Sequence, residues 1–304
     1  MIAAILRSSR VARMTLFLSV LSLTWASFSL LSRTARGSGD FSLFYRTALE
    51  LRRGASWEVY QERDITGELR CLAPPGITFL LYMPWMSSAA AAAVWLVFNL
   101  GLLGLSAWCL WNLCHRLDRQ SRLYTSTWPW ALALLLVLSA DGVQMGQFSV
   151  LFVTCWLSYL VVGNAFAGAA LLMLPTAVKV YPALLWAVPV ALRRYRDLLW
   201  LAPAGVLLGV LLPLLAFGDE LPALWRGFVQ YALPQRTQHM LRPWVESNQS
   251  LDNLLLRCLT DQPQFQAKYP YFPHLHLQPA LVTHLIMLLK LGVLTATALA
   301  AWRL

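Results

Sequence analysis

The chain has 304 residues, of which 58% are hydrophobic and only 12% are charged, and its mean hydropathy is +0.57. Soluble domains carry about twice that charged fraction, and the apolar residues here form long blocks typical of membrane helices. The excess of 24 Lys and Arg over 14 Asp and Glu is normal when basic residues gather in membrane loops. We therefore expect an all-α, polytopic transmembrane helical bundle that does not bind nucleic acid.

The first apolar run predicts a signal anchor that is retained. Arg7, Arg10 and Arg13 precede the run 14–32, which is long for a signal-peptide core and is followed by a poor cleavage pattern. By the positive-inside rule the N-terminus is then cytoplasmic. Further apolar runs bring the prediction to about eight spans; they cover residues 74–86, 88–113, 128–140, 148–163, 166–192, 197–217 and 279–302.

Two long polar loops, 33–73 and 218–278, share the outer face in this topology, within a single membrane domain that covers residues 1–304. The basic segment 193–196 falls inside, but the basic loop 115–127 falls outside, against the positive-inside rule. If 74–86 is a re-entrant segment, the loop 115–127 moves inside and 193–196 moves outside. Both versions place 33–73 outside.

The first loop contains a predicted amphipathic helix over 40–54. Phe41, Phe44, Ala48 and Leu51 recur at helical spacing, which gives a stripe that can lie on the membrane or against other helices. Asp40 stands where an N-cap is expected, and Gly54 stands at the C-cap. Asp40 is thus either a helix cap or a functional carboxylate that faces a cleft, and the two roles are compatible.

Lys179 lies within the apolar run 166–192, between Pro175 and Pro182. A cation at that depth costs at least ~2.5 kcal/mol on insertion scales. We therefore expect it to face a polar cavity or a partner, although snorkelling or pairing with Asp141 would also satisfy it.

The second loop carries groups suited to binding a sugar phosphate. Asn248, Gln249 and Ser250 offer consecutive donors and acceptors for sugar hydroxyls, although Ser250 could instead cap a helix. His239 and Arg242 could bind phosphate, as could Arg46, Arg52 and Arg53 in the first loop. The sequence has no DxD motif, so it requires neither a divalent metal nor another cofactor.

Five segments follow one another along the chain: "GDFSLFY", "APPGITFLLYMPW", "GQFSVLFVTCWLSYL", "AGAALLMLPTAVKVYPALL" and "NQSLDNLLLR". In this order they resemble glycosyltransferase family 87, the polyprenyl-phosphate-mannose-dependent mannosyltransferase-like membrane enzymes with a GT-C fold. The resemblance runs from about Thr15 to Arg257. Members of that family usually continue further, so the resemblance implies that the C-terminal part of the family domain is missing here.

The resemblance implies that Asp40 is the catalytic base. It also implies that the family's Gly-Gln pair, membrane lysine and Asn-Gln-Ser triplet match Gly146 with Gln147, Lys179, and residues 248–250. One carboxylate suffices for an inverting displacement, since the lipid phosphate is its own leaving group.

We therefore expect an enzyme at the outer face of the bacterial inner membrane. It would transfer a hexose, namely mannose, from a polyprenyl phosphate to a lipid-linked or envelope-glycan acceptor, surrounded by membrane lipids. Arg46, Gln147, Lys179, His239, Asn248, Gln249 and Ser250 are the candidate substrate-binding residues. The alternatives are a transporter or flippase, and a catalytically inactive membrane scaffold.

Overall fold

The structure, a computed structural model, describes residues 10–54, 57–61, 74–117, 124–179, 181–233, 259–260 and 277–303. Within these residues the regular elements are helices, and the β structure is one isolated bridge between Thr260 and Leu277. This confirms the all-α prediction. The chain divides into two compact units, the first formed by residues up to 187 with 194–232, and the second by 188–193 with 233–304.

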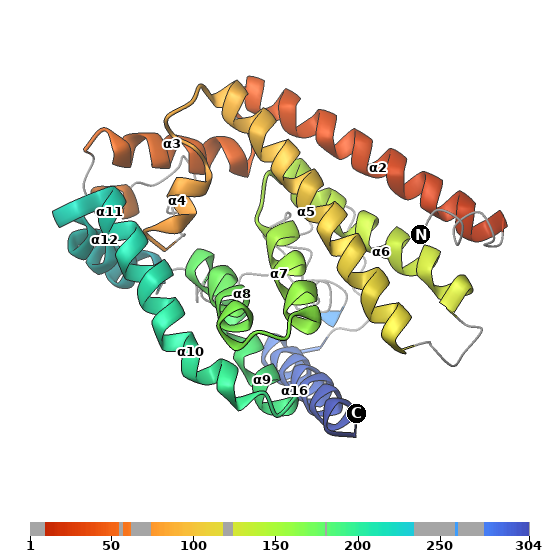
Figure 1. Cartoon of the computed structure of the whole chain (residues 1–304). Coiled ribbons are helices and arrows are strands. Elements are labelled where there is room, and N and C mark those ends of the chain that lie inside the picture. Colours follow the sequence, from red (N-terminus) through yellow and green to blue (C-terminus); the bar gives the residue numbers. More distant parts are fainter. Residues whose placement is uncertain are drawn as a thin grey trace. The chain divides into compact units, whose positions relative to one another are not determined.

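Figure 1 shows the helices coloured in chain order. They are α2 (Arg10–Ala35), α3 (Asp40–Arg52), η1 (Trp57–Tyr60), α4 (Ile77–Leu81), α5 (Ser88–Leu117), α6 (Tyr124–Met145), α7 (Ser149–Val161), α8 (Ala165–Val178), η2 (Tyr181–Trp186), α9 (Ala187–Ala191), α10 (Tyr195–Val206), η3 (Leu207–Leu211), α11 (Leu212–Phe217), η4 (Gly218–Glu220), α12 (Leu221–Gly227), η5 (Phe228–Ala232) and α16 (Pro279–Arg303).

Four helical stretches in the described chain are long and apolar enough to cross a membrane, and α7, α8 and part of α16 are shorter apolar helices. The long stretches leave large apolar side chains exposed, such as Phe17, Trp25 and Phe28 on α2, as lipid-facing surfaces do. The protein is therefore an integral membrane protein. The four stretches are Arg10–Ala35, Ser88–His115, Trp128–Met145 and Tyr195–Ala232.

The predicted span 74–86 is wrong. Only Ile77–Leu81 is helical there, and five residues rise about 7.5 Å. The helix ends because Met83 adopts a positive φ of 53° and Pro84 follows. The segment is short and packs within the protein, with Phe79 and Tyr82 fully buried, as the re-entrant alternative expected.

The outer loop predicted for 218–278 is also wrong at its beginning. η4, α12 and η5 continue directly from α11, so the stretch that begins at Tyr195 is helical as far as Ala232. Leu221, Leu224 and Phe228 are buried along it. Most of the rest of the predicted loop lies outside the described residues.

The directions of α2, α5 and α6 follow from their contacts. α2 and α6 run parallel, as a contact near the C-terminal end of both helices shows: Gln144 Nε2 donates to Ser29 Oγ at 3.1 Å. α5 runs the opposite way to α6: the ring of Trp111, near the end of α5, is 5.2 Å from that of Trp128, near the start of α6.

α7 is parallel to α5. The hydroxyls of Ser106 and Thr154 are 2.7 Å apart, and one turn further along both helices Cys109 Sγ and Ser158 Oγ are 3.5 Å apart. α5 and α7 therefore begin at the end of the first unit where α2 and α6 finish.

The predicted single span 166–192 is broken in the middle. α8 ends at Val178, whose carbonyl accepts a hydrogen bond from Thr78 Oγ1 at 3.2 Å, and Lys179 is extended. Pro182 then follows without an N–H to donate. The chain returns to the other end of the unit, where Arg194 donates to the carbonyl of Tyr159 near the end of α7.

This arrangement removes the conflict over the basic segments. We call the two ends of the first unit the Asp40 end, where α2 and α6 finish, and the Arg194 end, where α7 finishes. The N-terminus of α2, the end of α5, the start of α6, and Arg194 with Arg196 all belong to the Arg194 end. A short α4 and a broken 166–192 together place the described parts of these basic segments at one end.

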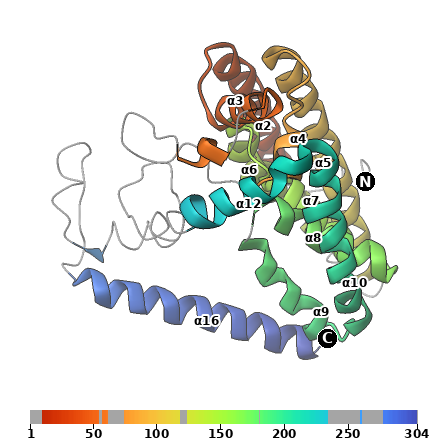
Figure 2. The ribbon, with the colours of Figure 1, turned by 90° about the vertical axis from the view of Figure 1, so that its left-hand side faces the viewer.

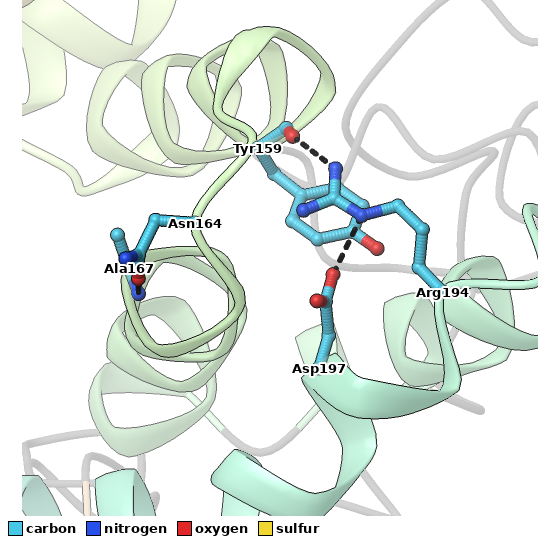
Figure 3. Close-up of polar contacts among 5 residues, drawn as sticks. All are labelled: Tyr159, Asn164, Ala167, Arg194 and Asp197. Atoms are coloured by element: carbon cyan, nitrogen blue, oxygen red, sulfur yellow. Dashed lines mark hydrogen bonds and ion pairs between the residues drawn. The ribbon is translucent and has the colours of Figure 1, made fainter.

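A largely buried polar cluster joins α7 to α10 at the Arg194 end (Figure 3). Arg194 Nε lies 2.8 Å from Asp197 Oδ2, and its Nη1 donates to the Tyr159 carbonyl at 3.1 Å. The guanidinium also covers the Tyr159 ring at 4.5 Å from the centroid. Separately from this cluster, the exposed Asn164 caps α8 by accepting from Ala167 N at 3.0 Å.

The second unit is described mainly by α16, which Figure 2 shows as one unbroken helix. Val282 and Ile286 of α16 are buried against Leu259 and Leu277. The Leu277 N–H also donates to the Leu259 carbonyl at 2.8 Å. The last predicted apolar run, 279–302, is thus confirmed as a helix.

Candidate active site

Asp40 is the first residue of α3, and the N-cap is Gly39. The Asp40 side chain makes no capping hydrogen bond, so its predicted capping role is wrong. Gly39 occupies the cap with φ +87°, a conformation that glycine adopts at little cost. Gly54 lies one residue beyond the C-cap, which is Arg53. The predicted helix itself is confirmed, and its acid is left available to another partner.

The apolar stripe of α3 packs against protein. Phe41, Ala48 and Leu51 are buried, and Phe44 is half-buried. The Phe41 ring is 5.4 Å from that of Tyr82 and 6.4 Å from that of Trp95 on α5. These aromatic contacts hold the first turn of α3, and therefore Asp40, at a fixed place on α4 and α5.

The turn between α6 and α7 approaches α3 very closely at Gly146. A Cβ added there would lie 2.5 Å from Phe41 Cβ and 3.2 Å from Leu30 Cδ1, and Gly146 has φ +71°. Only glycine combines this conformation with this approach. The next residue is Gln147, so the absence of a side chain at Gly146 brings Gln147 to the start of α3.

Gln147 Nε2 donates a hydrogen bond of 2.6 Å to Asp40 Oδ2. The two residues are 107 positions apart in sequence, and both side chains are half-buried. The structure therefore brings together the predicted catalytic acid and one predicted substrate-binding residue. A neutral amide that donates to a carboxylate orients it and leaves its other lone pairs free to accept a proton.

Two arginines border the turn that leads into α3. Arg46 is exposed, and its Nη2 donates to the Gly37 carbonyl at 3.1 Å. Arg33 is half-buried, and its Nη1 donates to Met145 Sδ at 3.5 Å. A positive charge near this carboxylate suits a phosphate leaving group. The sequence did not predict Arg33 as a site residue, because an arginine that directly follows an apolar run is typical of the flank of a membrane helix.

Tyr82 is a second residue that sequence reasoning missed. It is fully buried, and its hydroxyl donates to the Gly146 carbonyl at 3.1 Å. Burial, and then the negative charge of Asp40, raises the pKa of Tyr82 well above its usual value. The phenol is thus a protonated, permanent donor beside the Asp40 site.

Lys179 lies at the end of α8 rather than in the middle of a helix. It is half-buried, and its N–H donates to the Pro175 carbonyl at 2.9 Å. A cation at a helix C-terminus is favoured by the helix dipole. Its role in substrate binding stays a prediction. His239, Asn248, Gln249 and Ser250 lie outside the described residues.

A pocket of about 370 Å³ lies at the other end of α3. Its walls are mainly apolar, with Trp85, Phe79 and Phe217 among them, and Arg52 and Glu220 are its charged members. Arg52 is twelve residues along α3 from Asp40, which is about 18 Å. The pocket is therefore separate from the carboxylate site, although α3 connects them.

We expect Gly146→Ala to destabilise the protein by about 1–3 kcal/mol, because a side chain is strained at φ +71° and would press on Phe41. Thermal unfolding in detergent measures this change. Gly101→Ala in α5, where a Cβ meets nothing within 4 Å, is the control and should match the wild type or exceed it. Equal melting temperatures for both variants would contradict the close approach at Gly146.

Comparison with known proteins finds a match to a family model. The model of glycosyltransferase family 87 matches residues 72–304. Gln147 and Lys179 lie inside the matched segment, whereas Asp40 lies before it. No curated protein and no solved structure matches the chain. The family match covers most of the chain, and the membrane helices agree with it. The chain therefore belongs to glycosyltransferase family 87.

Proposed function

We propose that this membrane glycosyltransferase transfers mannose from a polyprenyl phosphate to a lipid-linked or envelope-glycan acceptor, with inversion and with Asp40 as the general base. The observation that carries this proposal is the 2.6 Å hydrogen bond from Gln147 to Asp40. It links the carboxylate to a residue inside the family-matched segment, and it holds a proton acceptor in a fixed orientation.

The surroundings of Asp40 support a single displacement. The acceptor hydroxyl loses its proton to Asp40 as its oxygen attacks the anomeric carbon, and the polyprenyl phosphate leaves with the bonding electrons. Arg33 and Arg46 border the turn beside Asp40 and are suited to the charge that grows on the phosphate. The apolar pocket near Arg52 suits part of a lipid chain.

The donor class is tested with the purified full chain in lipid nanodiscs. We expect radiolabelled polyprenyl-phosphate mannose to label lipid or glycan acceptors from a membrane extract, and nucleotide-linked mannose to give no label. The new glycosidic bond should have the opposite anomeric configuration to the donor. Transfer from the nucleotide sugar, or retention of configuration, would reject the proposal.

The orientation in a bacterial inner membrane is part of the same proposal. The described parts of the basic segments lie at the Arg194 end, which we expect to be cytoplasmic, so Asp40 faces outward. Arg36→Cys, after α2, should react with an impermeant thiol reagent in intact cells. Gly163→Cys, where a side chain meets nothing within 4 Å, should react only after the membrane is opened. The reverse labelling pattern would place Asp40 in the cytoplasm.

A further inference from the structure

The geometry points to Tyr82 as a positioning residue for this reaction: its hydroxyl holds the Gly146 carbonyl, and so fixes the turn that presents Gln147 to Asp40. The effect on catalysis rests on the proposed function of Asp40. The effect on the position of Gln147 does not.

The contacts of Tyr82 connect three segments of the first unit. Tyr82 follows α4, and its hydroxyl donates to the Gly146 carbonyl at 3.1 Å between α6 and α7. Its ring centroid lies 5.2 Å from that of Phe148 and 5.4 Å from that of Phe41, the neighbours of Gln147 and Asp40 respectively. The one side chain therefore contacts the residue next to each member of the hydrogen-bonded pair.

The turn needs such a contact because glycine is its least constrained residue. On the α6 side two backbone bonds close the turn: the Gly146 N–H donates to the Val143 carbonyl at 3.1 Å, and the Gln147 N–H donates to the Gly142 carbonyl at 2.8 Å. The Tyr82 hydroxyl holds the other side of the same peptide unit, at the Gly146 carbonyl. Rotation of the unit that joins Gly146 to Gln147 would break the Tyr82 bond as well as the Gly142 bond and would turn Gln147. A buried carbonyl that loses its donor also favours another conformation.

Tyr45 supplies a matched control. It is also buried, and its hydroxyl also donates to a backbone carbonyl, that of Met86. Its ring lies 6.2 Å from that of Phe41, but its bond closes on the segment before α5 and leaves the Gly146 turn untouched. Tyr45→Phe and Tyr82→Phe thus remove the same group from similar surroundings.

The position of Gln147 is measured by cross-linking. Asp40→Cys and Gln147→Cys are introduced together in the full chain with its native cysteines replaced, and a short thiol cross-linker is applied. We expect Tyr82→Phe to slow the cross-link about three- to tenfold, the factor that corresponds to one net hydrogen bond. Tyr45→Phe should leave it unchanged. An unchanged rate with Tyr82→Phe overturns the inference.

Catalysis is measured in the chain that keeps Asp40 and Gln147, with radiolabelled polyprenyl-phosphate mannose and normalised to folded protein. Tyr82→Phe should lower kcat by a similar factor and leave KM unchanged. Gln147→Ala should lower kcat too. The kcat of the double variant should be no lower than that of Gln147→Ala, since both substitutions act through one contact. Additive losses would overturn the inference. A slower cross-link with unchanged kcat supports the positioning of Gln147 and rejects its contribution to catalysis through Asp40.

Discussion

Asp40→Asn is expected to lower the rate of sugar transfer by a factor of ~10²–10⁴, the usual contribution of a general base. The substitution keeps the size of the side chain, and the amide oxygen can still accept the hydrogen bond from Gln147. It cannot take the proton of an acceptor hydroxyl. The measurement is transfer of radiolabelled mannose from polyprenyl phosphate by the purified variant, at equal amounts of folded protein.

The stability of this variant should change little. Asp40 makes no capping hydrogen bond, so asparagine forfeits only the favourable charge at the start of α3, about 0.3–1 kcal/mol. Asp141→Asn, which changes an exposed acid on α6, is the matched control and should keep wild-type activity. Near wild-type transfer by Asp40→Asn would reject the catalytic role and favour a different base.

The sequence predicted α3 well because local information suffices there. The stripe Phe41, Phe44, Ala48 and Leu51, the flanking glycines and Asp40 all lie within one short segment. The contact between Asp40 and Gln147 was out of reach, since it depends on a turn 107 residues away. The signal that was present is Gly146: a glycine before a polar residue, between two apolar helices, marks a possible close approach.

Hydropathy misplaced two spans because it measures composition and not surroundings. The segment 74–86 is apolar because Phe79 and Tyr82 are buried in protein, and a window average cannot distinguish that from lipid. The run 166–192 is apolar on both sides of its break at Lys179. In 218–233, Asp219 and Glu220 suggested a loop, although Leu221, Leu224 and Phe228 keep helical spacing.

The segment 193–196 shows a different limit. Its arginines were interpreted only as topology signals, and Arg196 is indeed exposed. Arg194, two residues earlier, is instead bound to Asp197 and to Tyr159 of α7. Sequence cannot separate these two roles, because the distinction depends on which arginine faces the turn between α7 and α8. Gly168 on α8 leaves space for the Arg194 and Asp197 side chains, because a Cβ there would lie 3.1 Å from Arg194 Nη2 and 3.2 Å from Asp197 Oδ2.

We expect Asp197→Ala to destabilise the protein by about 3 kcal/mol, because it leaves Arg194 without its counter-ion. The Asp197 side chain is only 4% exposed and that of Arg194 is 23% exposed. Removal of one member of a buried pair costs about 3–5 kcal/mol. The lower end applies here, since Arg194 keeps the Tyr159 carbonyl, the Tyr159 ring and some water. Thermal unfolding in detergent measures the loss, and Arg196→Ala, in the same turn, should be neutral.

A double variant shows whether the loss comes from the isolated charge. Arg194→Met with Asp197→Leu replaces the pair by apolar side chains, which is often neutral or stabilising for buried pairs. It should therefore recover most of the stability lost in Asp197→Ala. Because the cluster lies at the Arg194 end and Asp40 at the other, the double variant should also retain sugar transfer. If Asp197→Ala has the same melting temperature as the wild type, the pair does not join α7 to α10. If the double variant is as unstable as Asp197→Ala, the loss of stability comes from packing and not from charge.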